Sequence, residues 1–204
     1  MEEVSTSHPL VWIDCEMTGL DVENDVIIEI SCVITNGNLE VMDEKGWNAV
    51  IHQDQETMDK MDEWCTTTHA STGLTSEVLS STTTPTEAAE SLLTYIKSWV
   101  PEPRRALLAG NSVHADKAFL SKGPYKQIIE HLHYRILDVS SIKEAAKRWC
   151  DLRVLVDQPK KQGKHRGRED ILESIDEARY WKERVFQQVP VSKHEHEPIL
   201  AWHG

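Results

Sequence analysis

Apolar and polar side chains alternate along residues 10–16 (LVWIDCE), near the start of the chain. Successive side chains of a β-strand point to opposite faces of a sheet, so this alternation predicts a strand. Such a strand turns Val11, Ile13 and Cys15 into a core and directs Asp14 and Glu16 to the other face. Two carboxylates on one face of a strand repel each other unless a cation or a hydrogen-bond donor compensates them.

Other apolar runs predict the rest of a sheet. Residues 26–34 (VIIEISCVI) are rich in β-branched side chains and are bounded by turn-forming residues, which predicts a second strand joined to the first in a hairpin. We expect this meander to continue through residues 39–42 and 47–52. Shorter strands are predicted at residues 106–110 and 135–138.

Helical periodicity occupies much of the remaining chain. Thr84, Pro85 and Glu87 match a capping box with proline at the first helical position, and an apolar stripe follows to Trp99. Strands first and then strands alternating with helices predict an α/β fold with a mixed β-sheet flanked by helices. The other predicted helices are short ones through Met58, Met61 and Trp64, and longer ones at residues 115–120, 125–132, 139–149 and 171–185.

The chain has 204 residues, which fits one domain, and its 39% hydrophobic content suffices for a core. We expect a flexible N-terminus over residues 1–9, the domain over residues 10–186 and a C-terminal tail over residues 187–204. Residues 157–168 are basic, contain two glycines and lack apolar periodicity, which predicts a mobile loop. The tail contains the sequence HEHE, so metal binding there is an alternative to a disordered or loosely docked end.

The formal net charge of -12 argues against extensive non-specific binding to long DNA or RNA, whereas a short anionic substrate stays compatible. No apolar run approaches the length of a transmembrane helix, so no membrane association is expected. The acidic start of the chain shows no targeting segment. The four cysteines are scattered without a C-x-x-C pair, which favours reduced thiols over zinc ligation or disulfides. These features indicate an intracellular protein, cytoplasmic or mitochondrial.

Three segments concentrate acidic side chains: residues 12–16, 110–116 (GNSVHAD) and 165–170 (HRGRED). Together they indicate a two-metal phosphodiesterase site, because two ions about 4 Å apart can activate water and stabilise a leaving oxygen. Oxygen ligands suit Mg²⁺ or Mn²⁺. Taken singly, Asp116 and Asp170 are equally consistent with charges at helix starts, and His165 is more often an ordinary exposed loop residue. The candidate ligands are Asp14, Glu16, Asp116 and Asp170, and the candidate general base is His165.

The same three segments resemble the exonuclease motifs of the DEDDh 3′-to-5′ exonucleases, and within them the oligoribonuclease branch. The resemblance covers about residues 10–186. It implies a ribonuclease H-like fold, two Mg²⁺ or Mn²⁺ ions per active site held by the four carboxylates, and His165 as general base. It further implies removal of 5′ mononucleotides from the 3′ end of short RNA oligonucleotides, especially 5′-phosphorylated dinucleotides.

Further matches to this branch concern the two ends of a short substrate. By resemblance, Leu20 wedges between two bases, Trp64 and His69 belong to a base-stacking element, and Tyr134 stacks from the neighbouring subunit of a homodimer. Without the resemblance, ordinary packing would explain Leu20, Trp64 and Tyr134 better. The residues that by resemblance donate to the 5′ phosphate are Ser112, Arg135 and Ser140.

The third motif departs from the branch pattern at three consecutive positions. Gly167 and Arg168 replace the usual small and apolar residues, and Glu169 stands where aspartate is common. We expect Gly167 to loosen the loop and Arg168 not to pack as leucine would. If the altered loop has lost its base function, the chain would be a non-catalytic oligonucleotide-binding protein. A separate alternative within the same superfamily is a DEDDh exonuclease that acts on DNA or on longer strands.

Overall fold

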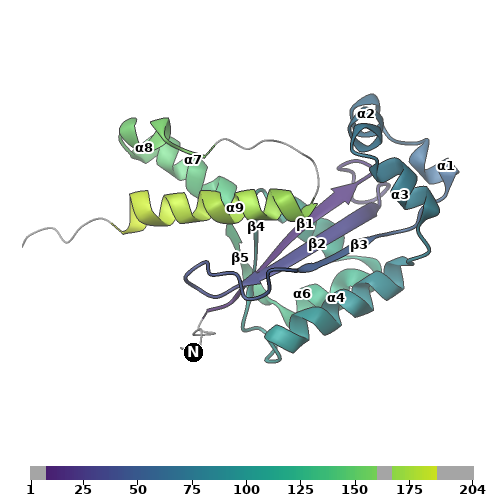
Figure 1. Ribbon diagram of the computed structural model, residues 1–204, viewed down its shortest axis with the longest axis horizontal. Coiled ribbons are helices and arrows are strands. Elements are labelled where there is room, and N and C mark those ends of the chain that lie inside the picture. The colour runs from purple at the N-terminus through teal and green to yellow at the C-terminus, as the bar shows by residue number, and fades with distance from the viewer. Residues whose placement is uncertain (1–7, 160–166, 188–204) are drawn as a thin grey trace, which may run out of the picture.

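A mixed five-stranded sheet forms the centre of the computed structural model, which describes residues 8–159 and 167–187. The strand order is β3-β2-β1-β4-β5 (Figure 1). The first strand pairs antiparallel with the second and parallel with the fourth, and the fifth continues the parallel half. The predicted mixed sheet is therefore confirmed. The strands are β1 Leu10–Met17, β2 Ile27–Thr35, β3 Trp47–Val50, β4 Leu107–Gly110 and β5 His133–Asp138.

Helices cover both faces of this sheet. In Figure 1, α9 crosses one face, α4 and α6 lie on the other, and α1 to α3 gather beyond one end of β2 and β3. None of the helices in the described ranges is both long and apolar enough to cross a membrane. The helices are α1 Gln55–Met58, α2 Glu63–Ser71, α3 Leu74–Ser80, α4 Pro85–Trp99, α5 His114–Leu120, α6 Lys126–His131, α7 Val139–Trp149, α8 Arg153–Val156 and α9 Gly167–Trp181, with a 3₁₀ turn at Gly123–Tyr125 and a π-helical turn at Lys182–Phe186.

The side chains of β1 alternate between two apolar cores. Val11, Ile13 and Cys15 are buried in the core shared with α4 and α6. Trp12 is buried in the other core, which contains residues of α7 and α9. The predicted alternation is confirmed, and it leaves Asp14 and Glu16 on the face that α9 covers.

The start of α4 has the capping box that the sequence predicted. The backbone N–H of Glu87 donates to the Thr84 hydroxyl over 3.2 Å, and the Glu87 carboxylate accepts from the Thr84 N–H over 2.8 Å. Two backbone donors that lack intrahelical partners are thereby satisfied. This helix packs against the first core through Ala88, Leu92 and Ile96.

The predicted strand over residues 39–42 was wrong, and the structure has only a single bridge there, between Thr35 and Val41. The Asn36 side chain accepts from the N–H groups of Asn38 and Glu40, and Leu39 has a φ of 70°. This side-chain-stabilised turn replaces ladder pairing.

Two predicted boundaries also change. The strand predicted over residues 47–52 ends at Val50, because the N–H of His52 donates to Thr83 outside the sheet. The predicted loop over residues 157–168 was wrong at its end, since Gly167 and Arg168 begin α9. Residues 160–166 and the tail sequence HEHE lie outside the described part of the chain.

Candidate active site

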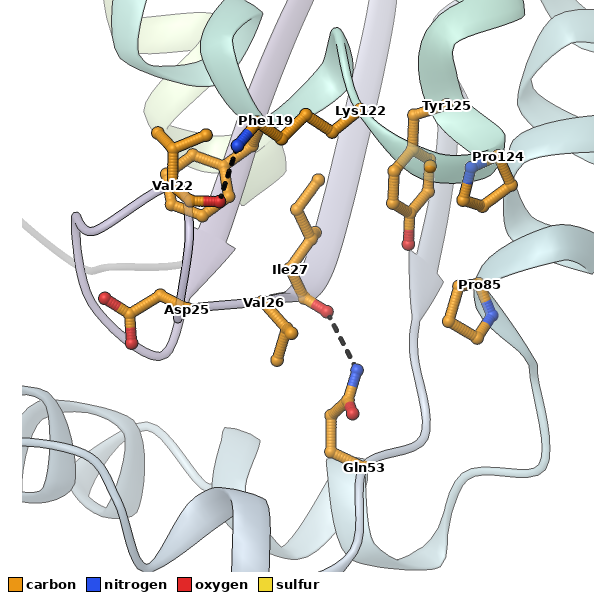
Figure 2. Close-up of a pocket in the computed structure, with 11 residues that line it drawn as sticks. Val22, Asp25, Val26, Ile27, Gln53, Pro85, Phe119, Lys122, Pro124 and Tyr125 are labelled. Carbon is orange, nitrogen blue, oxygen red and sulfur yellow. Dashed lines mark hydrogen bonds between the residues drawn. The ribbon is translucent and has the colours of Figure 1, made fainter.

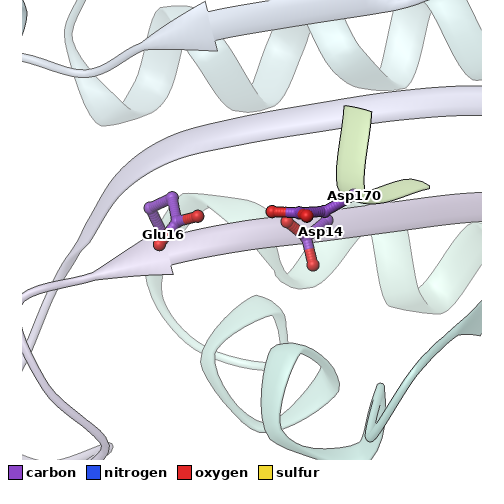
Figure 3. Close-up of side chains that lie close together, drawn as sticks. All are labelled: Asp14, Glu16 and Asp170. Atoms are coloured by element: carbon purple, nitrogen blue, oxygen red, sulfur yellow. The ribbon is translucent and has the colours of Figure 1, made fainter. Parts of the chain in front are cut away.

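Three carboxylates converge where β1 ends beneath the start of α9. Asp14, Glu16 and Asp170 each offer an oxygen, and these oxygens lie within 4.8 Å of one another. Figure 3 shows Asp14 and Asp170 side by side, with Glu16 further along β1. Three anionic groups at this spacing repel one another strongly unless a cation lies among them. Hard oxygen donors of this kind fit Mg²⁺ or Mn²⁺.

Asp116 approaches the same strand from α5. Its Oδ1 accepts a hydrogen bond of 2.9 Å from the backbone N–H of Cys15, the residue between Asp14 and Glu16. The carboxyl is buried, and burial raises the pKa of Asp116 to about 6. A divalent cation beside this carboxyl would favour its ionised form. The converging group among the described residues therefore holds three of the four predicted ligands, with the fourth beside it.

Gly167 sets how closely α9 approaches the sheet. A Cβ atom at this position would lie 2.5 Å from Ser31 Oγ, 2.8 Å from Ser31 Cβ and 3.6 Å from Asp14 Oδ2. Ser31 is the partner of Asp14 across β1 and β2. The missing side chain thus lets the first turn of α9 lie against Ser31, which brings Asp170 to Asp14. Gly167 was expected to loosen the loop, whereas within α9 it is buried and closely packed.

Arg168 fixes the same helical turn from outside. Its guanidinium donates to the backbone carbonyls of Glu44 and Lys45, in the connection between β2 and β3. As expected, Arg168 does not pack as leucine would, but it has a different anchoring contact. His165, the candidate general base, lies outside the described residues.

The loop after β1 presents Leu20 to solvent, with 77% of its surface exposed. One Asp25 oxygen accepts from the Thr18 hydroxyl over 2.9 Å, and the other accepts from the Asp21 N–H over 2.8 Å. Gly19 leaves the space that Asp25 occupies, since a Cβ there would lie 2.4 Å from the carboxylate. Asp25 therefore holds Leu20 on a preformed loop, a role that sequence reasoning missed.

The two residues of the predicted base-stacking element, Trp64 and His69, differ in exposure. Trp64 on α2 is 61% exposed. His69 on the same helix is only 1% exposed, and its Nε2–H donates to the carbonyl of Met17 over 3.0 Å. In this structure His69 joins α2 to the end of β1 and so positions the helix that carries Trp64.

Of the residues predicted for the 5′ phosphate, Ser112 and Ser140 meet at the carboxyl ends of β4 and β5, whereas Arg135 is the third residue of β5. The hydroxyl oxygens of Ser112 and Ser140 lie 3.2 Å apart. The Arg135 guanidinium lies 5.0 Å from the centre of the Tyr134 ring, and Tyr134 is 69% exposed. Sequence reasoning missed Asp138, which accepts from the backbone N–H groups of both serines. Its position directly before a predicted helix is the N-cap pattern that could have revealed it.

Comparison with known proteins decides the family. Residues 11–178 match the family model described as exonuclease. The chain is 51% identical to a probable oligoribonuclease of Schizosaccharomyces pombe, over 86% of this chain and 68% of that relative. The chain belongs to the oligoribonucleases, within the exonuclease family. It is also 43% identical to the mitochondrial oligoribonuclease of Homo sapiens, over 90% of this chain and 76% of that relative. The resemblance drawn from the motifs is confirmed.

Solved structures place the oligoribonuclease chain among ribonuclease H-like folds. A complex of E. coli exonuclease I with single-stranded DNA superposes with a TM-score of 0.64 at 12% identity, over 89% of this chain and 42% of that chain. Exonuclease I of Methylocaldum szegediense gives a TM-score of 0.57 at 17% identity, over 88% of this chain and 41% of that chain. The chain thus spans about two fifths of these structures, and at such identities the likeness concerns the fold.

A separate cavity of 270 Å³ lies behind the Leu20 loop of this oligoribonuclease. Figure 2 shows Val22 and Phe119 together on one side, and Tyr125 with Pro124 and Pro85 on the other. The lining shares no residue with the acidic cluster or with the predicted phosphate contacts. It is formed by Val22, Asp25, Val26, Ile27, Gln53, Pro85, Phe119, Lys122, Gly123, Pro124 and Tyr125.

Proposed function

We propose that this protein is a 3′-to-5′ exoribonuclease that hydrolyses short oligoribonucleotides, especially 5′-phosphorylated dinucleotides, to 5′ mononucleotides. The convergence of Asp14, Glu16 and Asp170 within 4.8 Å is the observation that carries the proposal. A non-catalytic binding protein has no need of a crowded anionic cluster, because such a cluster repels a phosphodiester unless cations are bound. The oligoribonuclease relatives support the same activity.

Membership in the exonuclease family and the acidic cluster indicate use of a divalent metal. We further propose that Asp14, Glu16, Asp116 and Asp170 hold two Mg²⁺ or Mn²⁺ ions per site. Bound ions of this kind lower the pKa of water and stabilise charge on a leaving oxygen. In this proposal His165 accepts the proton of the attacking water, because an imidazole titrates near working pH.

In this proposal, two sets of contacts select for short substrates: contacts to the bases, and a cap over the 5′ phosphate. Leu20 would separate the two bases while Trp64 stacks on one of them, and neither contact reads the base identity. Tyr134, exposed on one subunit, would stack in the site of its partner in a homodimer. Ser112, Arg135 and Ser140 would cap the 5′ phosphate, and the cap would exclude longer strands by steric contact.

We place the catalytic domain at residues 10–186, between the terminal segments 1–9 and 187–204. We expect the protein inside the cell, in the cytoplasm or in mitochondria. The human relative is named as a mitochondrial oligoribonuclease, which supports the second of these compartments. Fractionation of cells that express the tagged full chain, together with light scattering of the purified protein, tests the compartment and the homodimer.

The activity is tested by hydrolysis of a 5′-phosphorylated diribonucleotide with Mg²⁺ or Mn²⁺, with EDTA as control. Strands of two to eight nucleotides, as RNA and as DNA, compete in the same reaction. We expect metal-dependent turnover that is fastest on the diribonucleotide. Equal or faster turnover of long strands or DNA would support the wider DEDDh alternative, and tight binding without product would support a non-catalytic binder.

A further inference from the structure

We propose that Asp138 is the positioning residue that builds the 5′-phosphate cap, and that it thereby sets the preference for a 5′-phosphorylated end. The proposal rests on the proposed function for the identity of the ligand. Asp138 does not contact the phosphate in this proposal. It acts through Ser112 and Ser140, whose hydroxyl groups form the cap.

One carboxylate oxygen joins two segments that are far apart in the sequence. Oδ1 of Asp138 accepts from the Ser112 N–H over 3.0 Å and from the Ser140 N–H over 2.9 Å. The first bond crosses to the turn after β4, and the second caps α7. The Asp138 side chain is only 9% exposed, and its Oδ2 lies 3.5 Å from Nδ1 of His114. The relative position of the two serines therefore depends on one largely covered side chain.

The conformation of Ser112 needs this support. Its φ of 52° lies in the left-handed region, which residues with a Cβ rarely adopt. Such a conformation persists where the surrounding contacts determine it. The bond to Asp138 is a contact of this kind, and in this geometry Ser112 Oγ lies 3.2 Å from Ser140 Oγ. Two hydroxyl donors at this spacing can reach neighbouring oxygens of one phosphate group.

The negative charge of Asp138 disfavours phosphate binding, whereas the position of its acceptor oxygen supports it. A carboxylate beside a phosphate dianion repels it. What positions the two serines is therefore the acceptor oxygen of residue 138 and not its charge, and asparagine has a side chain of nearly the same shape. Asp138→Asn should keep both accepted bonds through its amide oxygen and bind the phosphate at least as well as the wild type.

Two further variants remove the acceptor in different ways. Asp138→Ala loses both hydrogen bonds. Asp138→Ser can still cap α7, because serine is a good N-cap residue. Its single short hydroxyl cannot at the same time accept the hydrogen bond from the Ser112 N–H. The serine variant therefore keeps the fold while it releases Ser112. Urea unfolding of each variant verifies that the protein is folded under the assay conditions.

The test compares the dissociation constants of 5′-phosphorylated and 5′-hydroxyl diribonucleotides by calorimetry in EDTA, which requires no turnover. Both ligands contain the same phosphodiester, so its repulsion by the metal-free acidic cluster cancels in the ratio of the two constants. We expect Asp138→Ala and Asp138→Ser to lose about 10- to 100-fold of the preference for the phosphorylated ligand, while Asp138→Asn retains it. With metal added, the loss should appear in KM, with kcat near the wild-type value. An unchanged preference in the folded serine variant, or an equal loss in the asparagine variant, would overturn the role of Asp138. Absent turnover in the wild type would instead overturn the proposed function, and the binding ratios would still test Asp138.

Discussion

The close contact between α9 and β2 leads to a sharp prediction for Gly167→Ala. The added Cβ would meet Ser31 Oγ at 2.5 Å and Ser31 Cβ at 2.8 Å, whereas carbon atoms in favourable contact lie about 3.5–4.0 Å apart. Ser31 cannot yield freely, because its Oγ accepts a 2.8 Å hydrogen bond from Asn48. The first turn of α9 must therefore move away from the sheet, and Asp170 moves with it.

The magnitude follows from two opposing effects. Overpacking a closely packed contact costs roughly 1–3 kcal/mol. Alanine is a better helix former than glycine by about 1 kcal/mol in a helix interior, and the benefit is smaller in a first turn. The net loss in the free energy of unfolding should be about 1–2 kcal/mol. Activity should fall further, about 10- to 100-fold, since a displacement of 1 Å at a reacting site can cost about 100-fold.

The assay pairs urea unfolding with turnover of the phosphorylated diribonucleotide for Gly167→Ala, Ser31→Ala and the double variant. Ser31→Ala removes the closer contact and leaves the contact with Ser31 Cβ, so the double variant should recover part of the lost activity. The coupling energy of the pair is the difference between the effect of the double variant and the sum of the two single effects. Wild-type activity in Gly167→Ala, or strictly additive effects in the double variant, would refute the steric explanation.

Three further changes test neighbouring parts of the site. Asp116→Asn should stabilise the metal-free protein at pH 8 by up to about 3 kcal/mol, because burial holds the pKa of Asp116 at about 6 in place of 3.8, and the same variant should lose activity. Correspondingly, the metal-free wild type should gain stability as the pH falls from about 6 towards 4, and an identical pH profile for Asp116→Asn would contradict this. Arg168→Leu should lower the free energy of unfolding by about 1–2 kcal/mol, since it removes the hydrogen bonds to the carbonyls of Glu44 and Lys45; full stability in urea would show that the anchor is dispensable. Asp25→Ala should release the Leu20 loop and raise KM for dinucleotides several-fold with little change in kcat, and a change confined to kcat in steady-state kinetics would exclude this role.

Features encoded by neighbouring residues were predictable from the sequence. The alternation around Asp14 and Glu16 gives the correct faces of β1, because side-chain direction in a strand depends only on position. The capping box at Thr84 gives the correct start of α4, because its partners lie three residues apart. The motifs also gave the correct family, since they combine several short segments.

Features that depend on distant contacts were not predictable. Gly167 suggested flexibility, and only the fold shows that Ser31, 136 residues earlier, fills the space beside it. The strand expected at residues 39–42 failed because side-chain hydrogen bonds of Asn36 stabilise a turn. His69 matched a base-stacking element, whereas its burial and its bond to Met17 depend on how α2 docks.

The most direct test compares two aspartates of α9. Asp170 belongs to the acidic cluster, while Asp176 lies on the exposed surface and pairs with Arg179. Single-turnover hydrolysis of the 5′-phosphorylated diribonucleotide would be measured with Mn²⁺ for Asp170→Asn and Asp176→Asn. We expect Asp170→Asn to be slower by about a thousandfold or more, because metal ions supply several kcal/mol of transition-state stabilisation, and Asp176→Asn to match the wild type. Wild-type rates in Asp170→Asn would contradict the assignment of the acidic cluster as the hydrolytic site.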